Sequence, residues 1–165
     1  MPAKVKIVPK ANKIIAAIKA DKCLIAEDLV NGKPKGCGHA GRCAMGALLF
    51  RGGMTNKALR QLNQGLEDLF RPDDWEVKGP GIAKAERILT KIYGITTQEQ
   101  VGAIMVRNDS FRPKGRKPSK EYDTTMYWFD QKHFPKVGTL AQATLRADAI
   151  IQFVRERWGK KKKGA

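Results

Sequence analysis

The chain has 165 residues, of which 42% are hydrophobic, and a formal net charge of +16 at pH 7. This length and composition suit one domain with a hydrophobic core. No apolar run is long enough to cross a bilayer, and the basic start of the chain lacks the hydrophobic segment of a signal peptide. We therefore expect a cytoplasmic protein, or one carried inside a virion, that has no membrane partner.

The chain contains three cysteines, an odd number in a sequence without a secretion signal. Such a number argues against a disulfide framework and in favour of reduced thiols. We therefore expect Cys23, Cys37 and Cys43 to be free.

The first elements in chain order are a helix and a loop. Apolar residues predict a helix from about residue 10 to 20, and its continuation through Leu24 and Ile25 is left open. Residues 31–42 contain four glycines and a proline, a composition that predicts a loop.

Two more helices follow in the first half of the chain. The segment CAMGALLF at 43–50 is predicted to be a helix that ends at the glycine pair beginning with Gly52. Thr55 or Asn56 then caps a helix whose apolar stripe continues to Phe70.

The second half begins with a turn-rich connector at 71–81 and a helix at 82–93. In that helix apolar residues share one side, while Lys84, Arg87 and Lys91 share the opposite side. Thr96 and Glu99 have the spacing of a capping box, so they predict a helix that runs to Arg107.

A long loop, from about 110 to 137, separates this helix from a last one that starts near Thr139. Strand-like alternation is limited to residues 4–8 and a short piece around 125–129. The sequence therefore predicts a mainly α fold, a single compact domain of five or six short helices at 11–158. A basic N-terminal extension at 1–10 and a basic C-terminal tail at 159–165 flank this domain.

Three segments, 1–22, 112–120 and 155–163, hold nearly all of the net charge, so the remainder is close to neutral. Such clusters neutralise phosphates and release counterions, which gives salt-dependent binding that is largely indifferent to sequence. The alternative is that they are solubilising tails, and an anionic membrane is a weaker partner because no apolar or lipid anchor accompanies them. Together with basic residues around the predicted helix at 82–93, the candidate nucleic-acid contacts are Lys78, Lys84, Arg87, Lys91, Arg112, Lys114, Arg116, Lys117, Lys120, Arg155, Arg157, Lys160, Lys161, Lys162 and Lys163.

The segment GCGHAGRC offers two kinds of chemistry around His39. Three thiolates and one imidazole could form a tetrahedral zinc site, but the spacing C-x13-C-x-H-x3-C matches no common zinc motif. Cys43 alone, at a helix N-terminus, could be a nucleophile with His39 or His133 as its base. Asn108 or Asp109 would then orient that base.

A structural interpretation of the same segment is favoured over both sites. In this interpretation Cys43, Gly46 and Ala47 are small residues that let another helix approach closely. No metal, cofactor or catalytic residue is therefore predicted, and the chain is more simply explained as a binding protein than as an enzyme.

The segment KGPGIAKAERIL at 78–89 resembles half of a helix-hairpin-helix DNA-binding element, with Gly81 and Ile82 at matching positions. The second glycine of that motif is replaced by Ala83, and the preceding connector is longer than the motif's hairpin. An exposed helix start beside Lys78 and Lys84 that takes a phosphate is the more general expectation.

Five basic residues precede a cluster of aromatic residues in the loop at 111–137. Rings beside positive charge suit single-stranded nucleic acid, whose bases stack on aromatic side chains. The alternative, favoured for Trp128 and Phe129, is that the rings fold inward as a lid over the helices.

The pieces CAMGALLF at 43–50, YGITTQEQ at 93–100 and VRNDSF at 106–111 resemble a pattern in small uncharacterised helical proteins of phages and bacteria. In that pattern Cys-x-x-Gly-Ala-Leu opens a helix and Asn-Asp ends a later one. The resemblance covers residues 40–111, and it implies a helical architecture and a phage or mobile-element origin. For this pair the sequence itself predicts a helix end at which Asn108 tolerates the left-handed conformation, with Asp109 able to cap the next turn.

We therefore expect a small basic protein that binds DNA or RNA, or another polyanion, mainly through phosphates. A structural or interaction protein, such as a virion component or a factor that targets a host protein, is the first alternative. An enzyme that depends on Cys43 or on zinc is the second.

Overall fold

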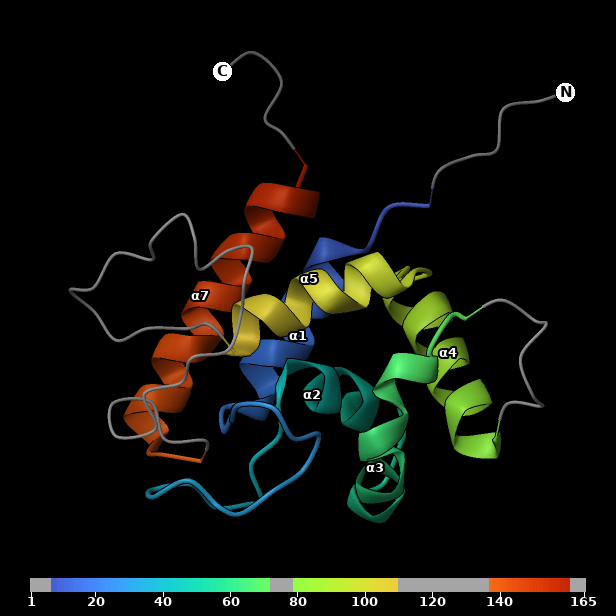
Figure 1. Ribbon diagram of the computed structural model, residues 1–165. Coiled ribbons are helices and arrows are strands. Elements are labelled where there is room, and N and C mark those ends of the chain that lie inside the picture. Colours follow the sequence, from blue (N-terminus) through green and yellow to red (C-terminus); the bar gives the residue numbers. More distant parts are fainter. Residues whose placement is uncertain (1–6, 72–78, 110–136, 161–165) are drawn as a thin grey trace, which may run out of the picture.

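The computed structural model describes residues 7–71, 79–109 and 137–160, and these form an α-helical arrangement without strands (Figure 1). The mainly α fold class is thereby confirmed. The described helices are α1 (Ala11–Asp21), α2 (Ala44–Arg51), α3 (Asn56–Leu62), the 3-10 helix η1 (Asn63–Asp68), α4 (Pro80–Tyr93), α5 (Gln98–Asp109) and α7 (Leu140–Trp158).

The core lies where α1, α2 and α5 meet between α7 on one side and α4 on the other (Figure 1). Apolar residues three and four apart on each helix face this centre, as amphipathic helices require. Ile18, Leu48, Leu89, Ile104 and Ile150, from five different helices, are all completely buried. Tyr93 is buried with them, and its hydroxyl donates to the Leu48 carbonyl at 2.7 Å.

Helix α1 ends at Asp21 and does not continue through Leu24 and Ile25. Lys22 adopts a left-handed conformation with φ of 65°, which stops the helix without a glycine. Leu24 and Ile25 are nonetheless fully buried, so their apolar character reflects the core and not a longer helix.

The predicted helix after Thr55 is divided into α3 and η1. Its N-terminus is as expected, because the Thr55 hydroxyl accepts from the Ala58 amide at 3.1 Å. Leu59, Leu62 and Leu69 are buried, so the apolar stripe is confirmed although the regular α-helix ends at Leu62.

The caps of the later helices were predicted with mixed success. At α7 the capping box of Thr139 and Gln142 is present, which confirms the predicted start. At α5 the prediction was wrong by one residue, since Thr97 and not Thr96 accepts from the amide of Gln100 at 3.2 Å.

Residues 22–43 form an irregular loop that is held by isolated bridges. Leu24 pairs with Arg42 and Asn31 pairs with Gly41, so the two arms of the loop lie side by side. Contrary to the expectation of reduced thiols, Cys23 and Cys37 form a disulfide across this loop. The close approach of the two arms, which residue spacing does not reveal, brings the sulfur atoms together.

Several expectations lie outside the described residues. These are the loop at 110–136, the extension up to residue 6, the connector at 72–78 and the tail from 161. Ile7 and Val8, from one of the two candidate strands, are described and are not in a strand. No described helix is both long and apolar enough to span a membrane.

Candidate nucleic-acid interface

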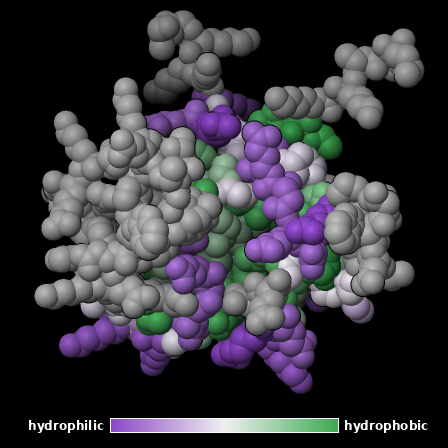
Figure 2. All heavy atoms as spheres, viewed as in Figure 1, coloured by the Kyte–Doolittle hydropathy of each residue, from purple (hydrophilic) through white to green (hydrophobic). Residues whose placement is uncertain are grey.

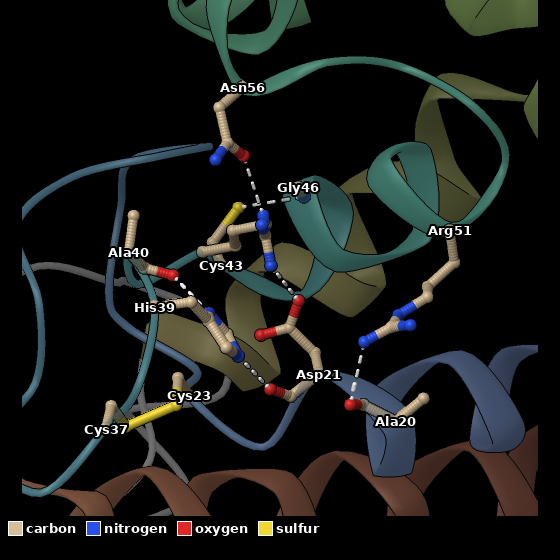
Figure 3. A network of polar contacts seen from close by, with 11 residues as sticks. Ala20, Asp21, Cys23, Cys37, His39, Ala40, Cys43, Gly46, Arg51 and Asn56 are labelled. Carbon is tan, nitrogen blue, oxygen red and sulfur yellow. Dashed lines mark hydrogen bonds and ion pairs between the residues drawn. A yellow bond between two sulfur atoms is a disulfide. The ribbon is translucent and has the colours of Figure 1, made fainter.

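His39 lies between main-chain oxygens and not beside thiolates (Figure 3). Its Nδ1 is 2.7 Å from the Ala40 carbonyl and its Nε2 is 2.8 Å from the Asp21 carbonyl. Because a carbonyl oxygen can only accept, both contacts are hydrogen bonds at once when both ring nitrogens carry a proton. Within the described ranges, no three potential metal-binding side chains come together. The segment therefore gives no support to a zinc site.

Arg42 holds the same region together from inside. Its guanidinium forms a buried ion pair with Asp21 at 2.8 Å, and its Nε donates to Asn56 at 3.0 Å. The guanidinium carbon also lies 3.5 Å from the centroid of the Phe50 ring. These contacts join α1, α2 and α3, so the buried charge of Arg42 is used for structure.

Cys43 is the N-cap of α2, as predicted, but its thiol is not a nucleophile in this structure. The sulfur accepts from the Gly46 amide at 3.4 Å, and the residue has no exposed surface. Burial raises the pKa of the thiol to about 12, and this effect outweighs the hydrogen bond from Gly46. The thiol therefore remains protonated at neutral pH and out of contact with solvent.

Gly46 shows why small residues follow Cys43. A Cβ atom at this position would overlap the carbonyl oxygen of Leu29, so only glycine lets the two backbones approach this closely. The expected close approach is confirmed, although the neighbour is the loop at Leu29 and not a second helix.

The expected helix end is confirmed, because α5 ends at Asp109, but Asn108 lies within the helix and does not adopt the left-handed conformation. Asn108 instead caps a different helix. Its Oδ1 accepts from the Ala44 amide at the start of α2, and its Nδ2 donates to the Ile25 carbonyl, each at 3.0 Å. Asp109 accepts from the Glu27 amide at 2.8 Å.

Arg146 completes this buried centre from α7, and the sequence analysis did not identify it. Its guanidinium donates to the Asn108 carbonyl. Burial lowers the pKa of Arg146 to about 10, while the nearby Asp109 opposes this change. Burial also raises the pKa of Asp109. The sequence contained one signal for its burial, the position of Arg146 along α7. It lies three residues after the buried Ala143 and next to the buried Ala147, on the side of the helix that faces the core.

The predicted basic face of α4 is present. Lys84, Arg87 and Lys91 are all exposed, and Ala85 and Leu89 are buried on the other side of the helix. Ile92, which was expected to face the core, is 36% exposed. Among the described residues the start of the helix is also open, because a Cβ atom at Gly79 or Gly81 would have none of them as a neighbour within 4 Å.

A second basic group lies at the C-terminal end of α7, where Arg155, Arg157 and Lys160 are exposed. Since α7 and α4 lie on opposite sides of the central helices, the two groups do not form one patch (Figure 1). The ion pairs found within the described ranges involve neither group, because they join Arg42 to Asp21 and Arg71 to Asp68. The remaining predicted contacts, outside the described residues, are Lys78, Arg112, Lys114, Arg116, Lys117, Lys120, Lys161, Lys162 and Lys163.

Two adjoining hollows lie beside the basic end of α7. One, of about 360 Å³, lies among residues 7–9, the first half of α5 and Trp158. The other, of about 310 Å³, lies between α5 and α7 next to Arg107 and Phe153. Ala103 and Arg157 line both hollows, so we describe them together as the α5–α7 groove. Sequence reasoning missed the groove because three separate segments form it.

No family model matches the chain, and no curated protein or solved structure is significantly similar to it. The function must therefore be argued from the site itself.

Proposed function

We propose that the protein binds nucleic acid mainly through phosphate contacts, with little dependence on base sequence. The observation that carries the proposal is the row of Lys84, Arg87 and Lys91 along the exposed side of α4. These residues are spaced by three and four positions, so their side chains project from one face over roughly 10 Å of helix.

Two further features support this face as a phosphate site. Lys84, Arg87 and Lys91 have no carboxylate within ion-pair distance among the described residues. The open N-terminus of α4 at Gly79 also directs free amides and the positive end of the helix dipole toward the same end of the surface.

The charge of the whole chain supports the same conclusion. A net charge of +16 attracts polyanions over the distance of a Debye length and speeds their association. In the space-filling view, hydrophilic side chains project around the described part of the surface, and hydrophobic ones show between them (Figure 2).

Charge reversal on α4 tests the proposal. We expect the triple variant Lys84→Glu, Arg87→Glu and Lys91→Glu to bind a labelled oligonucleotide at least about tenfold more weakly at low salt. The plot of log affinity against log salt should also become flatter, by about 0.9 for each duplex phosphate contact that is lost. Fluorescence anisotropy across a salt series measures both quantities.

A matched control separates this face from net charge. The triple variant Lys33→Glu, Lys57→Glu and Arg60→Glu changes the charge equally at exposed positions outside α4 and α7. It should lose clearly less affinity than the α4 variant. Equal losses would overturn the assignment to α4, and failure of the unaltered protein to bind at low salt would overturn the proposed function.

A further inference from the structure

The α5–α7 groove combines aromatic rings with arginines in one place. The Arg107 guanidinium carbon lies 5.3 Å from the centroid of the Phe153 ring, and this ring meets Trp158 edge-on at a centroid distance of 5.7 Å. Arg157, on the same helix as both rings, is exposed and lines both hollows. Two planar cations thus flank two rings along one groove.

The shape of the groove follows from helix packing. One wall is lined by residues between position 97, just before α5, and position 107 within it, a length of roughly 15 Å at the rise of an α-helix. The small side chain of Ala103 lies in the middle of this wall, where both hollows meet. Beyond Trp158 the groove is bordered by Ile7 and Val8, which are 53% and 55% exposed.

The charge of the lining selects an anionic occupant. Arg107 and Arg157 contribute positive charge, and Glu99 is the acidic residue among the described groups that line the groove. Exposed Arg155 and Lys160 extend the positive surface past the end of the groove. An occupant with both negative charge and flat apolar faces would use all of these groups.

We propose that the α5–α7 groove binds a segment of single-stranded nucleic acid. One base stacks on Trp158, and adjacent phosphates contact Arg107 and Arg157. Unpaired bases offer free faces to aromatic side chains, whereas the bases of a duplex are already stacked on one another. This inference rests on the proposed function and adds a preference for single strands and a site separate from α4.

The fluorescence of Trp158 tests the proposal directly. The chain has three tryptophans, and the variant Trp75→Phe with Trp128→Phe keeps Trp158 as the sole one. We expect a single-stranded oligonucleotide to quench this fluorescence, and a duplex of equal length to quench it much less. Binding measured by anisotropy without any change in Trp158 fluorescence would overturn the groove while leaving the proposed function intact.

Substitutions distinguish stacking from general packing. Trp158→Leu should weaken single-strand binding by about tenfold, the size of one lost base–aromatic contact, and leave duplex binding unchanged. Trp158→Phe should retain most of the affinity because it keeps a ring. Equal losses for the Phe and Leu variants, or equal losses for single strand and duplex, would contradict the proposal. Circular dichroism and urea unfolding establish that each variant is folded.

The phosphate contact has its own matched pair. Arg157→Gln should lower the salt slope for a single strand by about 0.7, and Arg60→Gln, an equal charge change on α3, should not. Polyglutamate serves as the competing polyanion. If it quenched Trp158 as strongly as the oligonucleotide, the occupant would be an acidic peptide and not nucleic acid. If neither nucleic acid bound at low salt, the proposed function would fail with the groove.

Discussion

Asn108 makes hydrogen bonds from one buried side chain to partners that lie 64 and 83 positions earlier in the chain. It satisfies an amide at the start of α2, which has no partner within its own helix, and the Ile25 carbonyl. It also donates to Asp109 at 2.8 Å. This residue thereby fixes α5 against α2 and against the loop that follows α1.

Asn108→Ala should lower the free energy of unfolding by about 3 kcal/mol, because it leaves a buried donor and a buried acceptor without partners. Urea unfolding followed by circular dichroism measures the change. Asn12→Ala, at an exposed position of α1, should change stability by less than about 0.5 kcal/mol. Equal effects of the two substitutions would show that the Asn108 contacts contribute little.

Residue roles of this kind could not be predicted from the sequence. The local sequence around Asn108 and Asp109 predicts only that a helix ends there. It cannot predict that Asn108 accepts from the amide of Ala44, which is distant in the chain. Cys43 was correctly placed at a helix start, yet its buried state reverses the effect on the thiol pKa that a helix start produces. Burial depends on which elements pack together, and the sequence of one element does not determine this.

At the scale of elements, α2 depends on its contact with the loop at Leu29. Gly46→Ala should destabilise the protein by about 1–3 kcal/mol, although alanine is the better helix former, because the added methyl group overlaps the Leu29 backbone. Gly102→Ala, in the middle of α5, adds a Cβ atom with no described residue within 4 Å and should instead stabilise by about 0.5–1 kcal/mol. Thermal unfolding of the two variants should therefore shift in opposite directions, and a shift in the same direction would contradict the contact.

Element positions were largely predictable from the sequence, and element ends were less so. The predicted helical segments correspond to the described helices, and the last helix starts near Thr139 as expected. The end of α1 was uncertain because Lys22, an ordinary residue, adopts the left-handed conformation that usually indicates glycine. The start of α5 was displaced because Thr96 and Thr97 are adjacent and both precede a suitable partner.

At the scale of the whole molecule, the Cys23–Cys37 disulfide restricts the unfolded chain more than it adds contacts to the folded one. Its cysteines are 14 positions apart, and closing a loop of this size stabilises a fold by about 3 kcal/mol. A reducing agent should therefore lower the urea midpoint of the protein. The double variant Cys23→Ala and Cys37→Ala should start at the lower midpoint and not respond to the reductant. A midpoint that reductant leaves unchanged in the unaltered protein would show that the bond is not formed.

The distribution of charge over the whole molecule differs from the sequence prediction of a nearly neutral body with basic appendages. Lys13 and Lys19 of the first basic segment belong to α1, and Arg155 and Arg157 belong to the last turns of α7. The folded helices themselves thus present two basic surfaces, on α4 and at the end of α7. The α4 surface could be predicted from one helix, whereas the groove beside α7 required the packing of α5 and the segment at residues 7–9.

Arg42 has a consequence for how relatives of this chain would be recognised. On a phosphate-binding surface lysine and arginine can often exchange, because both supply the charge. At Arg42 they cannot, since a planar guanidinium is needed to reach Asp21 and Asn56 while lying over the Phe50 ring. We therefore expect a distant relative to keep arginine at this position, whatever its surface binds.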